Sequence, residues 1–367
     1  MDTKSLDLLA RLTEAFGPSG FERDALRVMK EYVEGWSDSV AQDKLGSLLF
    51  EARGSADRPV ILLPGHVDEV GFLVTGVNDK GHLTFTQLGG WFVQVLLSQR
   101  VVVRTRKGDR EGVIAAKPPH LLDPEERAKV ITKDKMFIDL GCSTRKEAED
   151  LGVRVGDPVV PASRFSVLRK DTPEGVVELG LGKAFDDRVG AFMAAEVVRT
   201  LKQQRIPHAN RVIGAATVQE EVGLRGATTT GWMTEPDVVL ALEVDIAGDV
   251  PGIEPHQAPA VLGKGPSIVT FDASMIPNQA LKELAIATAV ELGVPYQLSS
   301  VARGGTDAGA VHKLRSGCPG LVIGVPTRHI HSQAGILNLR DVESCVALLV
   351  GLVRKLDRGT VEGLTRI

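Results

Sequence analysis

Apolar residues recur along this chain with two different periods, and the changes of period divide it. Helical spacing over residues 6–16 predicts a first helix, which the Gly-Pro pair behind it would end. Ser19 and Glu22 have the spacing of a capping box, and the apolar face behind them predicts a second helix over 25–33. A continuous apolar run over 59–64 then predicts a buried strand.

Helical periodicity is weak between about residues 71 and 169. Only 123–130 and 144–151 have a helical pattern there. The remainder consists of short β-type runs separated by Gly, Asp and Lys turns: 71–77, 82–87, 101–106, 112–115 and 157–161. This texture is typical of a small β-barrel or sandwich. We therefore predict a β-rich domain over 71–169, inserted into an α/β domain made of 1–70 and 170–367.

Strands and helices alternate again in the C-terminal half. The predicted strands are 211–218, 238–244, 267–271, 297–301 and 320–325. The predicted helices are 187–201, 277–292, 306–314 and 339–355. Such alternation indicates a mixed, mostly parallel sheet covered by helices on both faces. The predicted fold class is therefore α/β with an inserted β module.

Composition narrows the function. The chain has 367 residues, which suggests about two domains, and its 43% hydrophobic residues can form a large core. A net charge of −4 and 4% aromatic residues argue against a nucleic acid partner. No apolar run reaches the length of a membrane span or a secretory signal. Three widely spaced cysteines indicate reduced thiols, so we expect a cytoplasmic protein.

Acids and histidines follow the predicted strands in five places. In open α/β sheets, ligands bind at the carboxyl ends of the strands. The pairs are His66 and Asp68, Asp186 and Asp187, Glu220 and Glu221, Glu243 and Asp245, and His329 and His331. Any one pair has an ordinary structural explanation, such as a loop carboxylate or an N-cap acid. Five independent coincidences are hard to explain in that way.

Imidazole together with carboxylate suits Zn²⁺ or Co²⁺, whereas carboxylates alone would favour Mg²⁺ or Ca²⁺. Two histidines and several acids are enough for two metal ions that share one carboxylate. Such a pair polarises a carbonyl and makes hydroxide from water at neutral pH. We therefore expect two divalent ions per subunit, zinc or cobalt first, with manganese as the third candidate.

Five motifs in the same order resemble the tetrahedral (TET) aminopeptidases, dinuclear metallopeptidases that include glutamyl, leucyl and lysyl aminopeptidases. The motifs are residues 66–71, 184–188, 219–226, 304–308 and 326–332. The resemblance implies a zinc-peptidase-like catalytic domain whose inserted module is a PDZ-like dimerisation domain. It also implies peptide substrates, and dimers that build a tetrahedral dodecamer.

The resemblance also implies a role for each site residue. The metal ligands would be His66, Asp186 as the bridge, Glu221, Glu243 and His331. Glu220 would be the general base, and Asp68 would fix the imidazole of His66. Asp187 would shape the backbone beside Asp186, and Asp307 would have a supporting role.

Two departures from the family pattern leave alternatives open. Glu243 stands where the family often has Asp, so Asp245 is a rival ligand. His329 stands where the family often has a different aromatic residue. Residues two apart in an extended segment face the same side, so His329 could compete with His331.

Other functions are alternatives to a metal-dependent aminopeptidase. A deacylase or carboxypeptidase could use the same metal core. An endoglucanase is disfavoured, because glycoside hydrolysis needs two carboxylates that flank a sugar and no metal pair. A non-catalytic scaffold would lack a base or a ligand, and here every candidate is present.

Overall fold

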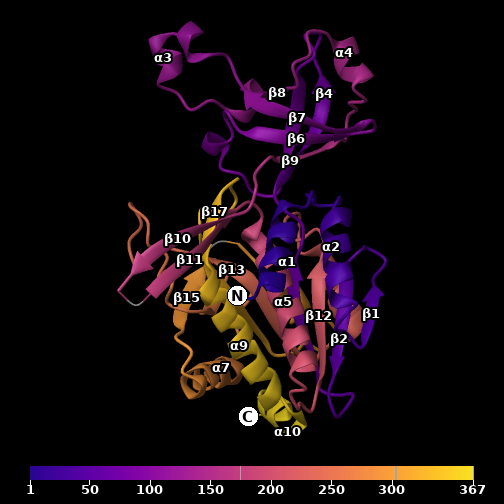
Figure 1. The fold of residues 1–367 in the computed structure, drawn as a ribbon, viewed down its shortest axis with the longest axis vertical. Coiled ribbons are helices and arrows are strands. Elements are labelled where there is room, and N and C mark those ends of the chain that lie inside the picture. The colour runs from indigo at the N-terminus through magenta and orange to yellow at the C-terminus, as the bar shows by residue number, and fades with distance from the viewer. Residues whose placement is uncertain (174, 302–303, 367) are drawn as a thin grey trace.

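The computed structural model describes residues 1–173, 175–301 and 304–366, and these form an α/β part and a β-barrel. Figure 1 shows the barrel standing on one end of the α/β part, next to the end of α1 and the start of α2. The predicted fold class, an α/β fold with a mixed sheet and an inserted β module, is confirmed.

The α/β part is built on an eleven-stranded sheet with the order β1-β2-β12-β3-β13-β16-β17-β11-β10, to which β14 and β15 attach beside β16. Its four central strands, β12, β3, β13 and β16, are parallel neighbours. The other strand pairs are antiparallel, except that β14 and β15 pair parallel to each other. The strands are β1 (Ser39–Gln42), β2 (Leu48–Arg53), β3 (Val60–His66), β10 (Ser166–Thr172), β11 (Gly175–Gly182), β12 (Arg211–Thr217), β13 (Val238–Ile246), β14 (Ser267–Asp272), β15 (Gln297–Val301), β16 (Gly320–Arg328) and β17 (Gly335–Asn338).

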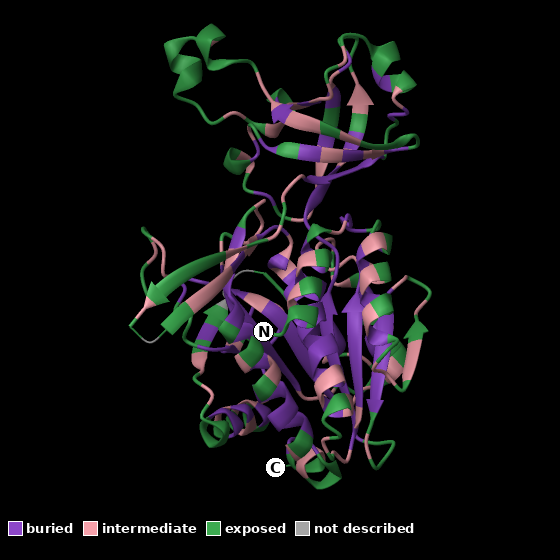
Figure 2. Cartoon of the chain, viewed as in Figure 1, coloured by how far each residue is buried: buried purple, intermediate pink, exposed green. Residues whose placement is uncertain are grey.

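Helices cover both faces of this sheet, which is why the central strands are apolar throughout. On β3, Ile61 and Leu63 belong to the core under α1, α5 and α9, whereas Val60 and Leu62 belong to the core under α6 and α8. Figure 2 shows the central strands buried, the edge strand β10 largely exposed, and the outer sides of the helices exposed. The helices are α1 (Thr3–Glu14), α2 (Arg23–Val33), α5 (Phe185–Gln203), α6 (Arg225–Thr234), α7 (Gln279–Leu292), α8 (Asp307–Val311), α9 (Leu339–Lys355) and α10 (Arg358–Gly363).

The barrel closes in the order β4-β5-β8-β7-β6-β9 and has its own core. Its strands are β4 (Gly71–Val77), β5 (Leu83–Leu88), β6 (Arg100–Thr105), β7 (Gly108–Ala115), β8 (Phe137–Asp139) and β9 (Pro158–Pro161). Two short helices, α3 (Pro124–Arg127) and α4 (Arg145–Asp150), lie outside it. The ring of Phe72 stacks on Trp91 with 4.9 Å between centroids and meets Phe85 edge-on at 5.2 Å.

Several local features of the structure differ from those that the sequence pattern predicts. Ser19 and Glu22 form no capping box, so that prediction was wrong: α2 begins at Arg23, and the Ser19 hydroxyl donates to Asp68 instead. The elements β1, β8, β17, α6 and α10 were not predicted, because they are short or rich in Gly and Thr. The division at residues 70 and 170 stays a prediction; β10, which crosses the second boundary, pairs with β11 in the large sheet.

None of the described helices is long and apolar enough to cross a membrane.

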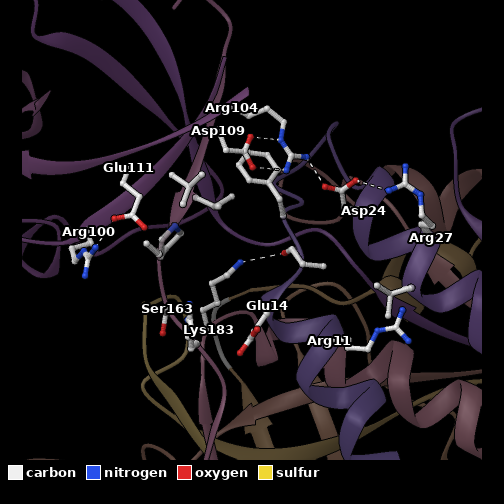
Figure 3. A pocket seen from close by; sticks show the side chains of 18 of the residues that line it. Arg11, Glu14, Asp24, Arg27, Arg100, Arg104, Asp109, Glu111, Ser163 and Lys183 are labelled. Carbon is white, nitrogen blue, oxygen red and sulfur yellow. Dashed lines mark hydrogen bonds and ion pairs between the residues drawn. The ribbon is translucent and has the colours of Figure 1, made fainter. Parts of the chain in front are cut away.

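One side chain of the barrel reaches across to the α/β part. The Arg104 guanidinium on β6 donates to Asp24 on α2 at 2.6 Å and to both oxygens of Asp109 at 2.9 Å. It also lies 3.8 Å from the centroid of the Phe16 ring. Figure 3 shows this contact at the edge of a cleft of 890 Å³ between the barrel, α1 and α2. Arg104 therefore fastens the barrel to the α/β part at a point near the end of α1.

We expect Arg104→Ala to loosen this contact without unfolding the protein. Exposed ion pairs contribute about 1 kcal/mol or less, and an arginine over an aromatic ring about 0.5–1 kcal/mol. The amide hydrogens of α2 and β6 should therefore exchange faster, and global stability should fall by no more than about 2 kcal/mol. Hydrogen-exchange mass spectrometry measures both effects.

The control is Arg100→Ala on the same strand. Among the described residues, Arg100 forms an ion pair only with Glu111 of the same domain, and its side chain is 71% exposed. This variant should leave exchange in α2 unchanged. Unchanged exchange of α2 in Arg104→Ala as well would show that Arg104 does not dock the barrel.

Candidate metal centre

The predicted site residues meet at one edge of the sheet. His66 ends β3, Glu243 lies near the end of β13, and Glu220 and Glu221 follow β12. Since β12, β3, β13 and β16 are parallel neighbours, their carboxyl ends lie side by side. His331, after β16, and Asp186, at the start of α5, complete the group lining one pocket of 570 Å³.

Asp186 lies between two imidazoles. Its Oδ1 is 3.2 Å from Nε2 of His66, and its Oδ2 is 3.1 Å from Nε2 of His331. Asp186 and its neighbour Asp187 have non-helical backbone angles although they lie in the first turn of α5. This geometry turns one carboxylate toward both rings at once, as a bridging ligand requires.

Two acids complete the surroundings of the rings. Glu220 Oε2 is 3.6 Å from Nε2 of His66, and Glu221 Oε1 is 3.6 Å from Nε2 of His331. Possible ligand atoms form two groups in which all atoms lie within 4.8 Å of one another. The first group has one atom each from His66, Asp186 and Glu221, and the second has one atom each from His66, Asp187 and Glu243.

The donor set fits divalent metal ions. Oε1 of Glu221 and Oε1 of Glu243 are buried and have no hydrogen-bond partner among the described residues. A buried carboxylate oxygen without a donor is costly unless a cation occupies the adjoining space. Imidazole nitrogens beside such oxygens make a combination suited to zinc, cobalt or manganese.

The charges of the group act strongly on one another. Burial, and after it the charge of the Asp186 carboxylate, raises the pKa of Glu221 to about 8. Burial also raises the pKa of Glu220 and of Glu243 well above the usual value. Burial lowers the pKa of His331, but the hydrogen bond with Asp186 and the charges of Asp186 and Glu221 together outweigh burial and bring that pKa to about 10. Divalent ions would compete with protons for these groups.

Comparison with known proteins identifies the chain. The family model described as M42 glutamyl aminopeptidase matches residues 46–348. The chain belongs to this family. It is a metallo-aminopeptidase, as the resemblance of its motifs to TET aminopeptidases had predicted.

Individual proteins that are similar to this chain support the family assignment. A TET aminopeptidase from the marine sediment archaeon Thaumarchaeota archaeon SCGC AB-539-E09 is 56% identical, with a TM-score of 0.95 and 99% of each chain covered. The TET1 peptidase of Pyrococcus horikoshii is 31% identical, with a TM-score of 0.84, 96% of this chain and 100% of that chain covered. The lysyl aminopeptidase of Pyrococcus furiosus is 31% identical, covering 95% of this chain and 97% of its own length.

In this M42 aminopeptidase, Asp68 connects the site residues to one another. Its Oδ1 accepts from the Glu220 amide at 3.0 Å, and its Oδ2 accepts from the Glu221 amide at 3.2 Å and the Ser19 hydroxyl at 2.6 Å. Oδ1 also lies 3.5 Å from Nδ1 of His66. Burial raises the pKa of Asp68, but hydrogen bonds from His66 and Ser19 hold it below the usual value. Asp68 thus fixes the backbone of the Glu-Glu pair and faces the His66 ring.

Asp187 and Asp307 are buried beside the centre. Asp187 Oδ2 accepts from the His66 amide at 3.1 Å, and its Oδ1 accepts from the Gly190 amide at 3.1 Å. Asp307 accepts from the Thr217 hydroxyl at 2.5 Å, and burial raises the pKa of Asp307 to about 6. Both side chains hold neighbouring chain segments in place.

His329 and Asp245, the two possible rivals of the proposed ligands, differ in their position relative to the pocket. His329 is exposed, and the positive φ angles of His329 (58°) and His331 (52°) break the extended geometry that would have put both on one side. His331 lines the pocket, and its Nδ1 bonds the Gly90 carbonyl of the barrel domain. Asp245 lines the pocket too but belongs to neither group of neighbouring ligand atoms.

A buried ion cluster, which the sequence pattern did not single out, lies under the centre. Lys183 Nζ contacts both oxygens of Glu69 at 2.6 Å, and Arg188 donates to Glu69 at 3.0 Å. Arg188 also donates to carbonyls of Leu12 and Val67. Burial lowers the pKa of Lys183 to about 8. This cluster joins the ends of α1 and β3 to the segment carrying Asp186. In the sequence, Glu69 and Arg188 lie inside two of the site motifs, and Lys183 directly precedes one of them.

We expect the Glu22 carboxyl to make the stability of the folded protein depend on pH. Its Oε1 accepts from the Gly20 amide at 2.6 Å and the Gln219 amide at 3.1 Å. Burial, with a smaller effect of the Asp68 charge, raises the pKa of Glu22 to about 7, against 4.5 in a model peptide. Between these values the folded protein keeps a proton that the unfolded chain has lost, so the Glu22 contribution to stability falls as the pH rises.

Glu22→Gln should remove that loss, because the amide oxygen can still accept both bonds. The variant should be more stable than the wild type at pH 8 by about 1–3 kcal/mol, with a smaller difference at pH 5. Urea unfolding at both pH values measures this. Glu34→Gln, at an exposed glutamate just after α2, is the control and should change neither. Equal effects of Glu22→Gln at both pH values would contradict the assignment.

Proposed function

We propose that this M42 enzyme removes the N-terminal residue from short peptides, with two divalent ions held by His66, Asp186, Glu221, Glu243 and His331. The observation that carries the proposal is Asp186, whose two oxygens lie 3.2 and 3.1 Å from the two imidazoles. A carboxylate in that position is suited to join two ions. When bound, the ions polarise the scissile carbonyl and lower the pKa of water.

Glu220 is the proposed general base. It lies in the pocket, 3.6 Å from His66, and donates no ligand atom to either group of neighbouring ligand atoms. Its raised pKa suits a group that accepts a proton from the attacking water and passes it to the leaving amine. Asp68 is the proposed positioning residue. It holds the amide of Glu220 and orients the His66 ring, as carboxylates beside ligand histidines do.

The alternatives differ in what the substrate must carry. An aminopeptidase needs a free α-amine at the scissile residue, whereas a deacylase or carboxypeptidase does not. Acetylated Leu-p-nitroanilide should therefore resist cleavage when Leu-p-nitroanilide is cleaved. Carboxymethylcellulose should be inert, since a glycosidase would use two carboxylates flanking a sugar and the candidate acids here surround imidazoles. Zinc, cobalt and manganese are the ions to compare.

The proposed assembly is a dodecamer built from six dimers, each joined through the barrel. The homologous PhTET1 crystallised as a dodecamer, and it can form a tetrahedron or a large octahedral shell. Exposed apolar side chains on the inserted domain support contacts there: Phe92, Val95, Leu121 and Val130. We place the enzyme in the cytoplasm, because its three cysteines are free thiols.

If the enzyme forms the proposed dodecamer, light scattering of the wild type should give a mass about twelve times the 39.3 kDa of one chain. Charged substitution of Phe92, which is 60% exposed, should reduce that mass because it places a charge in an apolar contact. The same substitution at Val290, 65% exposed on α7, is the control on the catalytic part. A monomeric wild type would contradict the proposed assembly.

Glu220→Gln tests the mechanism. The amide cannot take a proton, so kcat on Leu-p-nitroanilide should fall by about 10²–10⁴-fold. Plasma mass spectrometry should still find two ions per chain. The matched variant is Glu221→Gln, which should lose bound metal as well as activity. Near-wild-type turnover by Glu220→Gln would show that another group is the base.

A further inference from the structure

The pocket extends beyond the candidate metal centre. A substrate held by its α-amine and scissile carbonyl at the centre must place its N-terminal side chain in the remaining space. That space has apolar walls: Leu224, Val244, Ile246, Val269, Val322 and Ile330. It also has two further acids, Asp245 on β13 and Asp272 at the end of β14.

The charge of this pocket is one-sided. Six of the described residues that line it are carboxylic acids, and none is a lysine or an arginine. Four of these acids, Asp186, Glu220, Glu221 and Glu243, belong to the proposed centre, where two divalent ions would balance them. Asp245 and Asp272 have no such counter-charge within the described lining. A cationic group in the substrate would supply it.

Asp245 lies where a side chain could reach it. It is two residues beyond Glu243 on the same strand, so it faces the same side about 7 Å further along. In the register of β13 and β16, Asp245 pairs with Pro326, and a Cβ on Gly324, two residues earlier on β16, would lie 3.0 Å from the Cβ of Asp245. Gly324 thus adds no side chain next to Asp245, and apolar Val322 on the same strand lines the pocket.

Hydroxyl groups surround the Asp245 carboxylate. Ser267 and Ser299 lie close enough to lower its pKa, although burial dominates and raises it. Neither hydroxyl, nor Oδ2 of Asp245, has a hydrogen-bond partner of good geometry among the described residues. Asp245 itself is only 3% exposed. A buried carboxylate and two hydroxyls with unused acceptor capacity match the three donors of an ammonium group.

Asp272 forms the other acidic wall and is held rigidly. Its Oδ1 accepts from the amide and the hydroxyl of Ser274, both at 2.6 Å, and its Oδ2 accepts from the Thr306 hydroxyl at 3.0 Å. Every partner is a neutral donor, so these bonds position the negative charge and do not cancel it.

We infer that Asp245, supported by Asp272, selects peptides with a lysine or arginine at the N-terminus. This inference rests on the proposed function, because it takes the centre as the place where the scissile bond lies. The four-carbon stem of lysine would pack on the apolar walls while its ammonium meets Asp245.

The test compares p-nitroanilides of lysine, norleucine and glutamate, with two ions per chain confirmed for each enzyme. Norleucine has the lysine stem without the charge, so it is the matched substrate. The wild type should prefer lysine to norleucine, and glutamate should be the poorest. Asp245→Asn should lower kcat/KM for lysine by about tenfold to a hundredfold, because an ion pair becomes a neutral contact. Norleucine should be unaffected, and glutamate should improve.

Inhibition of the wild-type enzyme by amino acid amides covers the case in which Asp245→Asn does not fold. Lysinamide should inhibit the wild type more strongly than norleucinamide does, and Asp272→Asn should weaken that difference.

Three results would overturn the inference. The first is a wild-type preference for glutamate or norleucine. The second is an unchanged ratio of lysine to norleucine in Asp245→Asn. The third is loss of both activities together with bound metal, which would make Asp245 a ligand. An enzyme carrying two ions that cleaves none of the substrates would instead overturn the proposed function.

Discussion

The structure depends on holding several carboxylates buried within a few ångströms of one another at one edge of a sheet. Burying a carboxylate without a partner is unfavourable, and like charges at this range oppose one another's ionisation. The raised pKa values of Glu220, Glu221 and Glu243 express that opposition. Two imidazoles offset part of it, and divalent cations are suited to offset the remainder. The same electrostatic demand explains both the choice of residues and their position.

The parallel strands make this convergence possible. Four neighbouring strands end at the same edge, so short loops suffice to bring together residues far apart in sequence. Around them the protein adds further fixed charges. Lys183 and Arg188 clamp Glu69 under the centre, and Asp68 holds the amides of the Glu-Glu pair. The barrel contributes as well, since the Gly90 carbonyl bonds His331. A module whose main role is proposed to be assembly therefore also shapes the site.

Much of this could be predicted from sequence, for a definite reason. Buried parallel strands are apolar throughout, so the polar residues that end them stand out, as His66 does after 59–64 and Glu220 after Val218. Features set by tertiary contacts could not be predicted. Ser19 has the spacing of a cap, but its hydroxyl serves Asp68. Asp186 faces both rings only because the first turn of α5 is non-helical. His329 turns outward through a positive φ angle that no pattern of apolar residues encodes.

The central claim is that Asp186 joins two cations, and anomalous diffraction tests it most directly. Crystals grown with zinc and measured at the zinc edge should give two strong peaks about 3.5–4 Å apart, one on each side of the Asp186 carboxylate. One peak should adjoin His66 and the other His331. A single peak, or two peaks of which neither adjoins Asp186, would contradict the account.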